Sequence, residues 1–229
     1  MSAARGGGAK AAEDRLPAVM LTLTVVSGFL DAVSYLGLGR VFTANMTGNV
    51  VVLGFAAAGA PGFSAYASLV SVAGFLLGAV LAGRFAVAMT ERPTHTWFGG
   101  ALTAEAALTG SAAAIAATTT GTGRRYAVVA VLAVAMGIRN STVRRMAVPD
   151  MTTTVLTMTL TGLAADSSLA GGTDPRAARR VGSVLGMALG AFAGAWFVLH
   201  HGIHWPLAIS AICVTLVALT YGLLGRRSG

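Results

Sequence analysis

The chain has 229 residues, of which 55% are hydrophobic and only 10% charged, and its mean hydropathy is +0.74. An ordinary globular domain carries about 25% charged residues, so the composition excludes a water-soluble fold. The net charge of +8 would favour nucleic-acid binding in a soluble chain. Here the basic residues lie in short clusters beside apolar runs, as in membrane proteins. We expect the lipid bilayer as a partner and no nucleic acid.

Residues 1–15 are rich in Gly and Ala, charged and without hydrophobic periodicity, which predicts a disordered cytoplasmic tail. The apolar stretch from Leu16 to about Leu36 is too long for the core of a signal peptide and lacks a convincing cleavage site. It is therefore predicted to be a retained first membrane helix.

Seven further apolar segments follow, separated by Gly- and Pro-containing turns. They cover residues 46–60, 65–89, 97–119, 125–145, 150–165, 178–200 and 204–225. Most reach about 20 residues, enough to cross about 30 Å of hydrocarbon. Segment 46–60 is short and opens with polar residues, and segment 150–165 is rich in Thr.

The topology depends on whether these two weak segments cross the membrane. With eight spans and a cytoplasmic N-terminus, ten Lys and Arg residues lie inside and six outside; with six spans, thirteen lie inside and three outside. The positive-inside rule favours six spans. The sequence thus predicts an all-α integral membrane protein with six spanning helices and two shorter polar helices, re-entrant or broken, and eight spans as the alternative. Both termini are expected in the cytoplasm, at the plasma membrane.

The chain also resembles a tandem duplication, with repeats at 16–120 and 121–225 and a short basic tail at 226–229. Matching residues recur in the same order 108 to 110 positions later. The pairs are Gly28 and Gly137, Asp31 and Asn140, Thr47 and Thr157, Asn49 and Thr159, Gly74 and Gly182, Leu77 and Leu185, Gly78 and Gly186, and Trp97 and Trp205. Internal repeats are common in transporters, although chance matches of Gly and Thr are the alternative in so biased a sequence.

The polar residues of 28–49 predict one side of a substrate site. Asp31 lies late in the first helix, and Asn45, Thr47 and Asn49 open the next segment. An acidic residue in a membrane helix normally faces a partner or a water-filled cavity. A helix that starts at membrane depth points free N–H groups at whatever lies there. Alternatively, Asp31 lies at the headgroups and the Asn and Thr side chains only cap a helix.

The second half predicts the other side of this site, formed by Arg139, Asn140, Thr154 and Thr157. Arg139 either pairs with Asp31, which lowers the burial cost of both charges, or extends toward the lipid phosphates. The Thr hydroxyls either bind a polar ligand or bond to the carbonyl four residues earlier.

Glu105 lies well inside segment 97–119, so a proton relay through Asp31 and Glu105 is one prediction. A hydrogen bond from Glu105 to a neighbouring helix is the other. His200, His201 and His204 cluster without an accompanying Cys or acid, so no metal or other cofactor is predicted. Since no nucleophile–base pattern occurs, we do not expect an enzyme.

Three motifs resemble the YoaK-like family of bacterial polytopic membrane proteins of unknown function. They are Gly-Phe-Leu-Asp-Ala at 28–32, Asn-Met-Thr-Gly-Asn at 45–49, and Gly-Ile-Arg-Asn at 137–140 followed by the Thr-rich residues 152–159. The resemblance covers about 16–225. In the second half Thr-Met-Thr at 157–159 replaces a Thr-Gly-Asn-like triplet. The resemblance implies a multi-pass protein of the bacterial inner membrane and carries no activity.

Taken together, these features favour a small secondary transporter or permease with a polar site near the membrane midplane. Its partner would be a small polar solute, and a homo-oligomer is compatible with the sequence. The alternative is a non-transporting membrane scaffold, a lipid-binding protein or a sensor.

Overall fold

A computed structural model of the whole chain describes all residues except 1, 93, 119–120, 147–155, 174–175 and 227–229. The described residues form α-helices, one short 3-10 helix and no strand. The elements are α1 (Ser2–Gly37), α2 (Met46–Ala57), α3 (Ala65–Ala88), α4 (Thr94–Thr118), α5 (Thr122–Met146), α6 (Leu156–Ala165), η1 (Ser168–Ala170), α7 (Ala177–His201) and α8 (His204–Arg226).

Six of these helices contain stretches of 18 to 25 residues that are apolar enough to cross a membrane. They are α1, α3, α4, α5, α7 and α8. The other two, α2 with 12 residues and α6 with 10, reach only about 18 and 15 Å at 1.5 Å per residue. The prediction of an all-α integral membrane protein with six long and two short helices is confirmed.

The start of α1 differs from the sequence prediction. The helix begins at Ser2 and continues through residues 2–15, for which the sequence predicts a disordered tail. Ala is the strongest helix former, and this Ala-rich stretch extends a helix that is already nucleated in residues 16–37.

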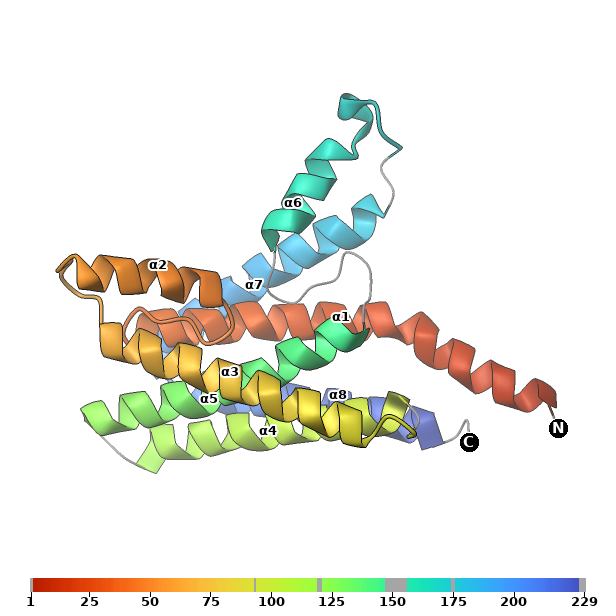
Figure 1. Cartoon of the computed structure of the whole chain (residues 1–229), viewed down its shortest axis with the longest axis horizontal. Helices are drawn as coiled ribbons and strands as arrows, with labels where there is room; N and C mark the ends of the chain where they lie inside the picture. The colour runs from red at the N-terminus through yellow and green to blue at the C-terminus, as the bar shows by residue number, and fades with distance from the viewer. Residues whose placement is uncertain (1, 93, 119–120, 147–155, 174–175, 227–229) are drawn as a thin grey trace.

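The spanning helices form a bundle in which successive helices run in opposite directions (Figure 1). The first turns of α1 and the last turn of α8 therefore lie at the same end, which we call the α6 end; the opposite end, where α1 meets the chain leading to α2, is the α2 end. α1 packs along α7, α3 along α5, and α4 against both α5 and α8. α1 and α5 are the most enclosed spanning helices.

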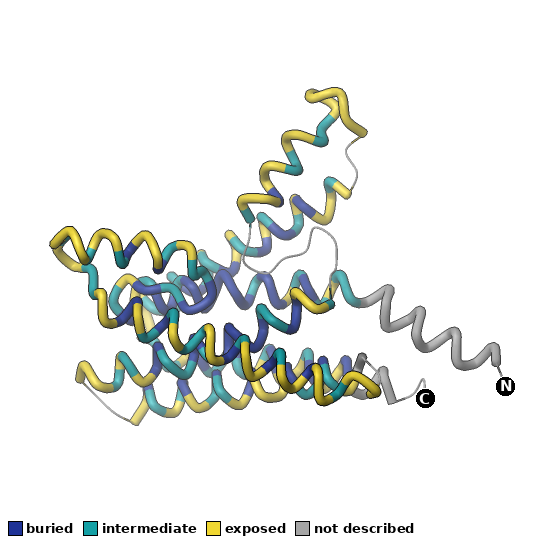
Figure 2. The backbone as a smooth tube through the Cα atoms, viewed as in Figure 1, coloured by how far each residue is buried: buried dark blue, intermediate teal, exposed yellow. Residues whose placement is uncertain are grey.

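The bundle has large apolar side chains on its outer surface as well as in its core. Many large apolar residues of the spanning helices are exposed, and Figure 2 shows exposed residues along the outer faces. They include Leu69, Leu76, Leu77, Leu185, Leu189, Phe192, Ile212 and Leu216. Conversely, charged and hydroxyl side chains such as those of Ser27, Glu105 and Arg139 are buried. This distribution suits hydrocarbon as the surrounding solvent.

α1 and α7 touch backbone to backbone at three glycines, one of which, Gly194, lies against the carbonyl oxygen of Phe29. A Cβ atom on Gly28 would overlap the carbonyl oxygen of Met187, and one on Gly190 would overlap the carbonyl oxygen of Val25. Small residues allow helices to approach this closely in lipid. A larger side chain at any of these glycines would force α1 and α7 apart.

α3 and α5 make a pair of contacts like those of Gly28 and Gly190. Gly137 lies against the carbonyl oxygen of Phe75, and Gly78 lies against the carbonyl oxygen of Val134. The corresponding residues are 109 positions apart in α1 and α5, and 112 apart in α3 and α7: Val25 and Val134, Gly28 and Gly137, Phe75 and Met187, Gly78 and Gly190. The α1–α7 and α3–α5 interfaces are thus built alike.

The helix contacts differ in register from the sequence match of Gly78 with Gly186. In the contacts, Gly190 of α7 takes the place that Gly78 has in α3, one helical turn later than Gly186. Because α7 has glycine at every fourth position from Gly182 to Gly194, a shift of four residues leaves the glycine pattern almost unchanged. Only the backbone contact with α1 distinguishes the two registers.

Candidate functional site

After α1 the chain turns back into the bundle before α2 begins. The turn uses left-handed backbone at Gly39 (φ 97°) and Arg40 (φ 57°), a conformation that glycine adopts at little cost. α2 then starts at Met46, where the N-cap residue Asn45 accepts a hydrogen bond from the amide of Gly48 at 3.4 Å. From this inner start α2 runs back toward the α2 end (Figure 1).

Asn49 fastens the loop before α2 to α3. Its side chain accepts a hydrogen bond from the amide of Phe42 at 2.9 Å and donates to the carbonyl of Phe42 at 2.7 Å and to Ser71 Oγ at 3.1 Å. Ser71 Oγ also donates to the Phe42 carbonyl at 2.6 Å. Asn49 is fully buried. Its hydrogen bonds hold the loop before α2 against α3, and we call them the Asn49 clamp.

Asp31 holds the same loop from the side of α1. Its carboxylate accepts a hydrogen bond from the amide of Ala44 at 3.3 Å, and the residue is buried. Asp31 lies about 9 Å before the end of α1 at Gly37. The loop therefore reaches well below the α2 end, to the point where Asn45 begins the turn into α2.

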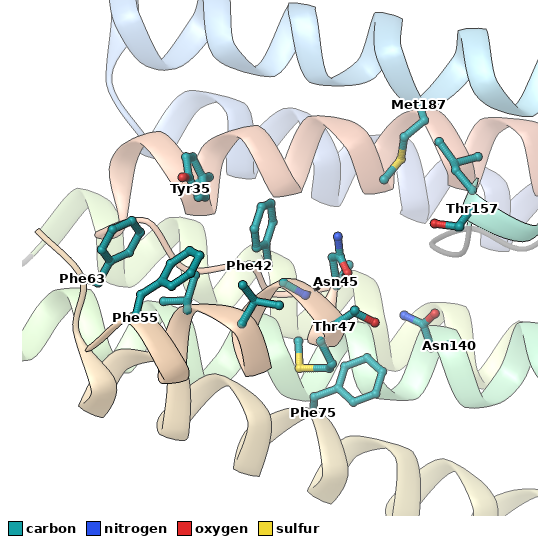
Figure 3. Close-up of a pocket in the computed structure, with 16 residues that line it drawn as sticks. Tyr35, Phe42, Asn45, Thr47, Phe55, Phe63, Phe75, Asn140, Thr157 and Met187 are labelled. Carbon is teal, nitrogen blue, oxygen red and sulfur yellow. Dashed lines mark hydrogen bonds between the residues drawn. The ribbon is translucent and has the colours of Figure 1, made fainter. Parts of the chain in front are cut away.

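A cavity of about 700 Å³ opens beside the starts of both short helices (Figure 3). Phe75 is the eleventh of 24 residues in α3 and Met187 the eleventh of 25 in α7, so the cavity lies near the middle of the bundle. Its lining comprises Tyr35, Phe42, Ala44, Asn45, Met46, Thr47, Gly48, Val51, Val52, Phe55, Phe63, Phe75, Asn140, Leu156, Thr157 and Met187.

The first and the second part of the chain both contribute residues to this lining. Phe75 and Met187, which occupy the same place in the two helix interfaces, both face the cavity. Thr47 from the first turn of α2 and Thr157 from the first turn of α6 also line it. The cavity thus lies where the two halves meet.

Aromatic residues line the cavity toward the α2 end (Figure 3). The rings of Tyr35 and Phe42 stack with centroids 4.9 Å apart, and those of Phe55 and Phe63 meet edge to face at 5.5 Å. The guanidinium of Arg40 lies over the Phe63 ring, 5.6 Å from its centroid. These contacts make the wall of the cavity aromatic on the side of the α2 end.

Glu105 and Arg139 form a second polar region within the bundle. The Arg139 guanidinium donates to the Glu105 carboxylate, to the carbonyl of Leu23 at 3.2 Å and to Ser27 Oγ at 3.0 Å. Both charged side chains are inaccessible to solvent, and the small gap beside them holds no water-sized sphere. The pair therefore joins α4, α5 and α1.

This pairing corrects both predictions for Arg139. Its ionic partner is Glu105 and not Asp31, and its side chain does not extend to the membrane surface because it is 1% exposed. Sequence alignment of the two halves placed Arg139 opposite Leu30, next to Asp31, but said nothing about α4. For Glu105 the structure shows the contact with a neighbouring helix.

The predicted site residues therefore divide into two groups. Asn45, Thr47, Asn140 and Thr157 line the cavity, and Asn140 also donates to the carbonyl of Met136 at 2.9 Å. Asp31, Asn49 and Arg139 are not among the lining residues. Thr154 lies outside the described residues.

Sequence reasoning missed the aromatic side of the cavity and the partners Ser27 and Ser71. The relevant pattern was visible, since Phe42, Phe55 and Phe63 flank the polar motif at 45–49. In an apolar sequence such rings resemble ordinary lipid-facing residues. In the described part of the chain, no three His, Cys, Asp or Glu side chains come together as metal ligands.

Comparison with known proteins shows the family of the chain. A family profile described as "Protein of unknown function (DUF1275)" matches residues 19–220. The chain belongs to the DUF1275 family. It is also 32% identical over 150 residues to the UPF0700 transmembrane protein YoaK of Bacillus subtilis (strain 168). That match spans 64% of each chain, slightly less than two thirds of YoaK.

These matches confirm the YoaK-like resemblance and a multi-pass membrane protein of the DUF1275 family. No solved structure matches the chain.

Proposed function

We propose that this DUF1275 protein is a small secondary transporter that holds a solute in the cavity at the membrane midplane. One observation carries the proposal: the cavity lies at mid-depth between two halves that line it with equivalent residues, Phe75 and Met187. Secondary transporters bind substrates near the midplane, at the interface of internal repeats and beside broken helices.

The proposed repeats are inverted. In the bundle α1 runs opposite to α5, α3 opposite to α7, and α4 opposite to α8 (Figure 1). If the two halves are exchanged, the α1–α7 contact takes the place of the α3–α5 contact. Inverted halves can adopt each other's conformation, which opens the shared site first to one side and then to the other.

The proposed orientation has the α6 end in the cytoplasm of the bacterial cell. Arg40, Arg124 and Arg125 belong to the α2 end, whereas the other Lys and Arg residues, apart from Arg139 within α5, belong to the chain termini or to the loops and helix ends of the α6 end. This distribution agrees with the positive-inside rule. The aromatic residues of the α2 end would then close the cavity on the outer side.

Asp31 is the better candidate for coupling transport to protons. Its carboxylate holds the amide of Ala44, one residue before Asn45 in the cavity wall. Protonation would remove the charge from this hydrogen bond and loosen the loop. Glu105 is instead engaged with Arg139 in a gap without room for water.

Cysteine accessibility tests the proposal without knowledge of the solute. Cys213, the single cysteine of the chain, is first replaced by Ala. Thr47→Cys and Thr157→Cys are then treated, from one side at a time, with an uncharged maleimide–sugar reagent that does not cross lipid. Alternating access predicts that both positions react from either side.

Two control positions define the sides. Ala58→Cys at the α2 end and Leu169→Cys at the α6 end are exposed and should each react from one side only. If Thr47→Cys and Thr157→Cys also react from a single side, or from neither, the chain does not alternate and is no transporter.

A lipid-binding protein is the second candidate. Val51 and Phe55 line the cavity and are also 49% and 47% exposed. The cavity wall is therefore continuous with the apolar outer surface, through which an acyl chain could enter. This alternative predicts that neither cavity cysteine reacts with the water-borne reagent.

A further inference from the structure

Among the described residues that line the cavity, none is Asp, Glu, Lys, Arg or His. Among its sixteen residues the polar side chains are the hydroxyls of Tyr35, Thr47 and Thr157 and the amides of Asn45 and Asn140. The described charged residues Asp31, Arg40 and Arg139 of the neighbouring elements contact other groups of the protein.

The contacts of these charged groups are specific. The Asp31 carboxylate accepts a hydrogen bond from the Ala44 amide. The Arg139 guanidinium binds Glu105, and the Arg40 guanidinium lies over the ring of Phe63. None of these four charged residues is among the described residues of the cavity lining. A charged solute would therefore leave water without meeting an opposite charge on the described lining, which is unfavourable.

Several neutral polar groups of the lining have capacity for a ligand. Within the described part of the chain, the hydroxyls of Tyr35, Thr47 and Thr157 and the side-chain nitrogen of Asn45 make no hydrogen bond to protein. These groups can donate to or accept from an uncharged amide, hydroxyl or carbonyl.

The remaining lining suits a flat apolar group. Phe42, Phe55 and Phe75 present rings to the cavity, together with Met46 and Met187. Aromatic faces and edges pack favourably with another planar ring, and methionine sulfur adapts to its shape.

We infer that the cavity selects uncharged amphipathic solutes that combine a planar apolar group with an amide or hydroxyl, and that it rejects organic anions and cations. This inference rests on the proposed function for its role in transport, but the selectivity can be measured by binding alone.

Three probes of nearly the same shape test it: benzamide is neutral, benzoate is an anion and benzamidine is a cation. Equilibrium dialysis of the full-length chain in uncharged detergent should show benzamide binding at least about tenfold more tightly than either ion, because only the ions lose hydration without a counter-charge. Benzoate or benzamidine binding as tightly as benzamide, or no measurable binding of benzamide, would overturn the inference.

Asn45→Asp provides the sharpest variant. Aspartate caps a helix as well as asparagine, so α2 should still start at Met46, but a negative charge now faces the cavity. The variant should reverse the order, with benzamidine binding several-fold more tightly than benzamide. An unchanged order would show that the probes bind elsewhere and would overturn the inference.

Two pairs of hydroxyl removals, one in the cavity and one on the outer surface, provide a test with a matched control. Tyr35→Phe and Thr47→Val should together weaken benzamide binding roughly two- to tenfold. Tyr66→Phe and Thr103→Val should not, because Tyr66 and Thr103 are exposed and are not lining residues. Equal effects of the two pairs would contradict the assigned cavity.

The cysteine-labelling test of transport and the binding test of solute class can fail independently of each other. If the cavity cysteines alternate but a charged probe binds best, only the assigned solute class is wrong. If benzamide is selected but the cysteines do not alternate, the solute class stands and transport is wrong.

Discussion

The Glu105–Arg139 pair and the cavity both place polar groups near the middle of the bundle. The pair is charged but has no room for a water molecule beside it, whereas the cavity has room for a solute but no charged residue in its described lining. The pair joins three helices through an ionic contact and hydrogen bonds to Leu23 and Ser27. The cavity collects hydroxyls and amides that have few protein partners.

This difference distinguishes polar groups that hold the helices together from polar groups that have few protein partners. Buried charges cost too much to remain unpaired, so Glu105 and Arg139 are committed to each other and to the fold. Neutral hydroxyls cost less to leave without a protein partner, so they remain available to the solute that we propose. Charge alone was therefore a poor guide to the residues that line the cavity.

Removal of one member of the ion pair should have the largest effect. Glu105→Met leaves the Arg139 guanidinium buried without its counter-charge and should lower the free energy of unfolding by about 3–5 kcal/mol, measured by thermal and denaturant unfolding in detergent. Glu105→Met combined with Arg139→Met should recover most of this loss. A double variant as unstable as the single one would show that the pair is not an isolated unit.

Loss of the Asn49 clamp should come next. Asn49→Ala leaves the buried amide and carbonyl of Phe42 and the hydroxyl of Ser71 short of partners, at a cost of about 1–3 kcal/mol. It should also raise the labelling rate of Thr47→Cys, because the loop before α2 loosens. Thr103→Ala on the outer face of α4 serves as the control, with a change within about 0.5 kcal/mol.

The second short helix is fastened more weakly. Arg180 of α7 donates to the carbonyl of Gly162 at 2.6 Å and pairs with Asp166 at 2.7 Å, where the Asp166 side chain is 45% exposed. Asp166→Asn should therefore cost only about 0–1 kcal/mol. Added salt should increase Thr157→Cys labelling in the parent chain but not in Asp166→Asn; equal responses would show that this ion pair does not hold α6.

Asp31→Asn should have the smallest effect on stability, since the amide oxygen can still accept from Ala44. Its consequence should be functional: the labelling rate of Thr47→Cys should vary with pH in the parent chain and become independent of pH in the variant. A parent chain without pH dependence, under conditions that correct for thiolate formation, would exclude Asp31 as the proton site.

Much of the helix arrangement was predictable because lipid imposes a simple rule on composition. The apolar segments at 65–89, 97–119, 178–200 and 204–225 match α3, α4, α7 and α8 within about three residues. The short helices were also expected, and α2 and the described α6 (Leu156–Ala165) fall within segments 46–60 and 150–165. Residues 147–155 lie outside the described part of the chain.

The site was predicted only in part. Asn45, Thr47, Asn140 and Thr157 line one cavity, because polar residues at the starts of short helices stand out in an apolar sequence. Asp31, Asn49 and Arg139 stand out equally, but their hydrogen bonds are made to the loop, to α3 and to α4. Sequence spacing does not distinguish a polar group satisfied by protein from one that faces a cavity.

The sequence by itself determined the solvent of this protein, the number of long and short helices and its family, because each of these depends on local composition or on short motifs. Tertiary structure alone decided that Arg139 meets Glu105, that Gly190 and not Gly186 corresponds to Gly78, and that five aromatic residues surround the cavity. These are contacts between helices distant in sequence. They depend on rotation and register, and a four-residue glycine pattern leaves the register open by whole helical turns.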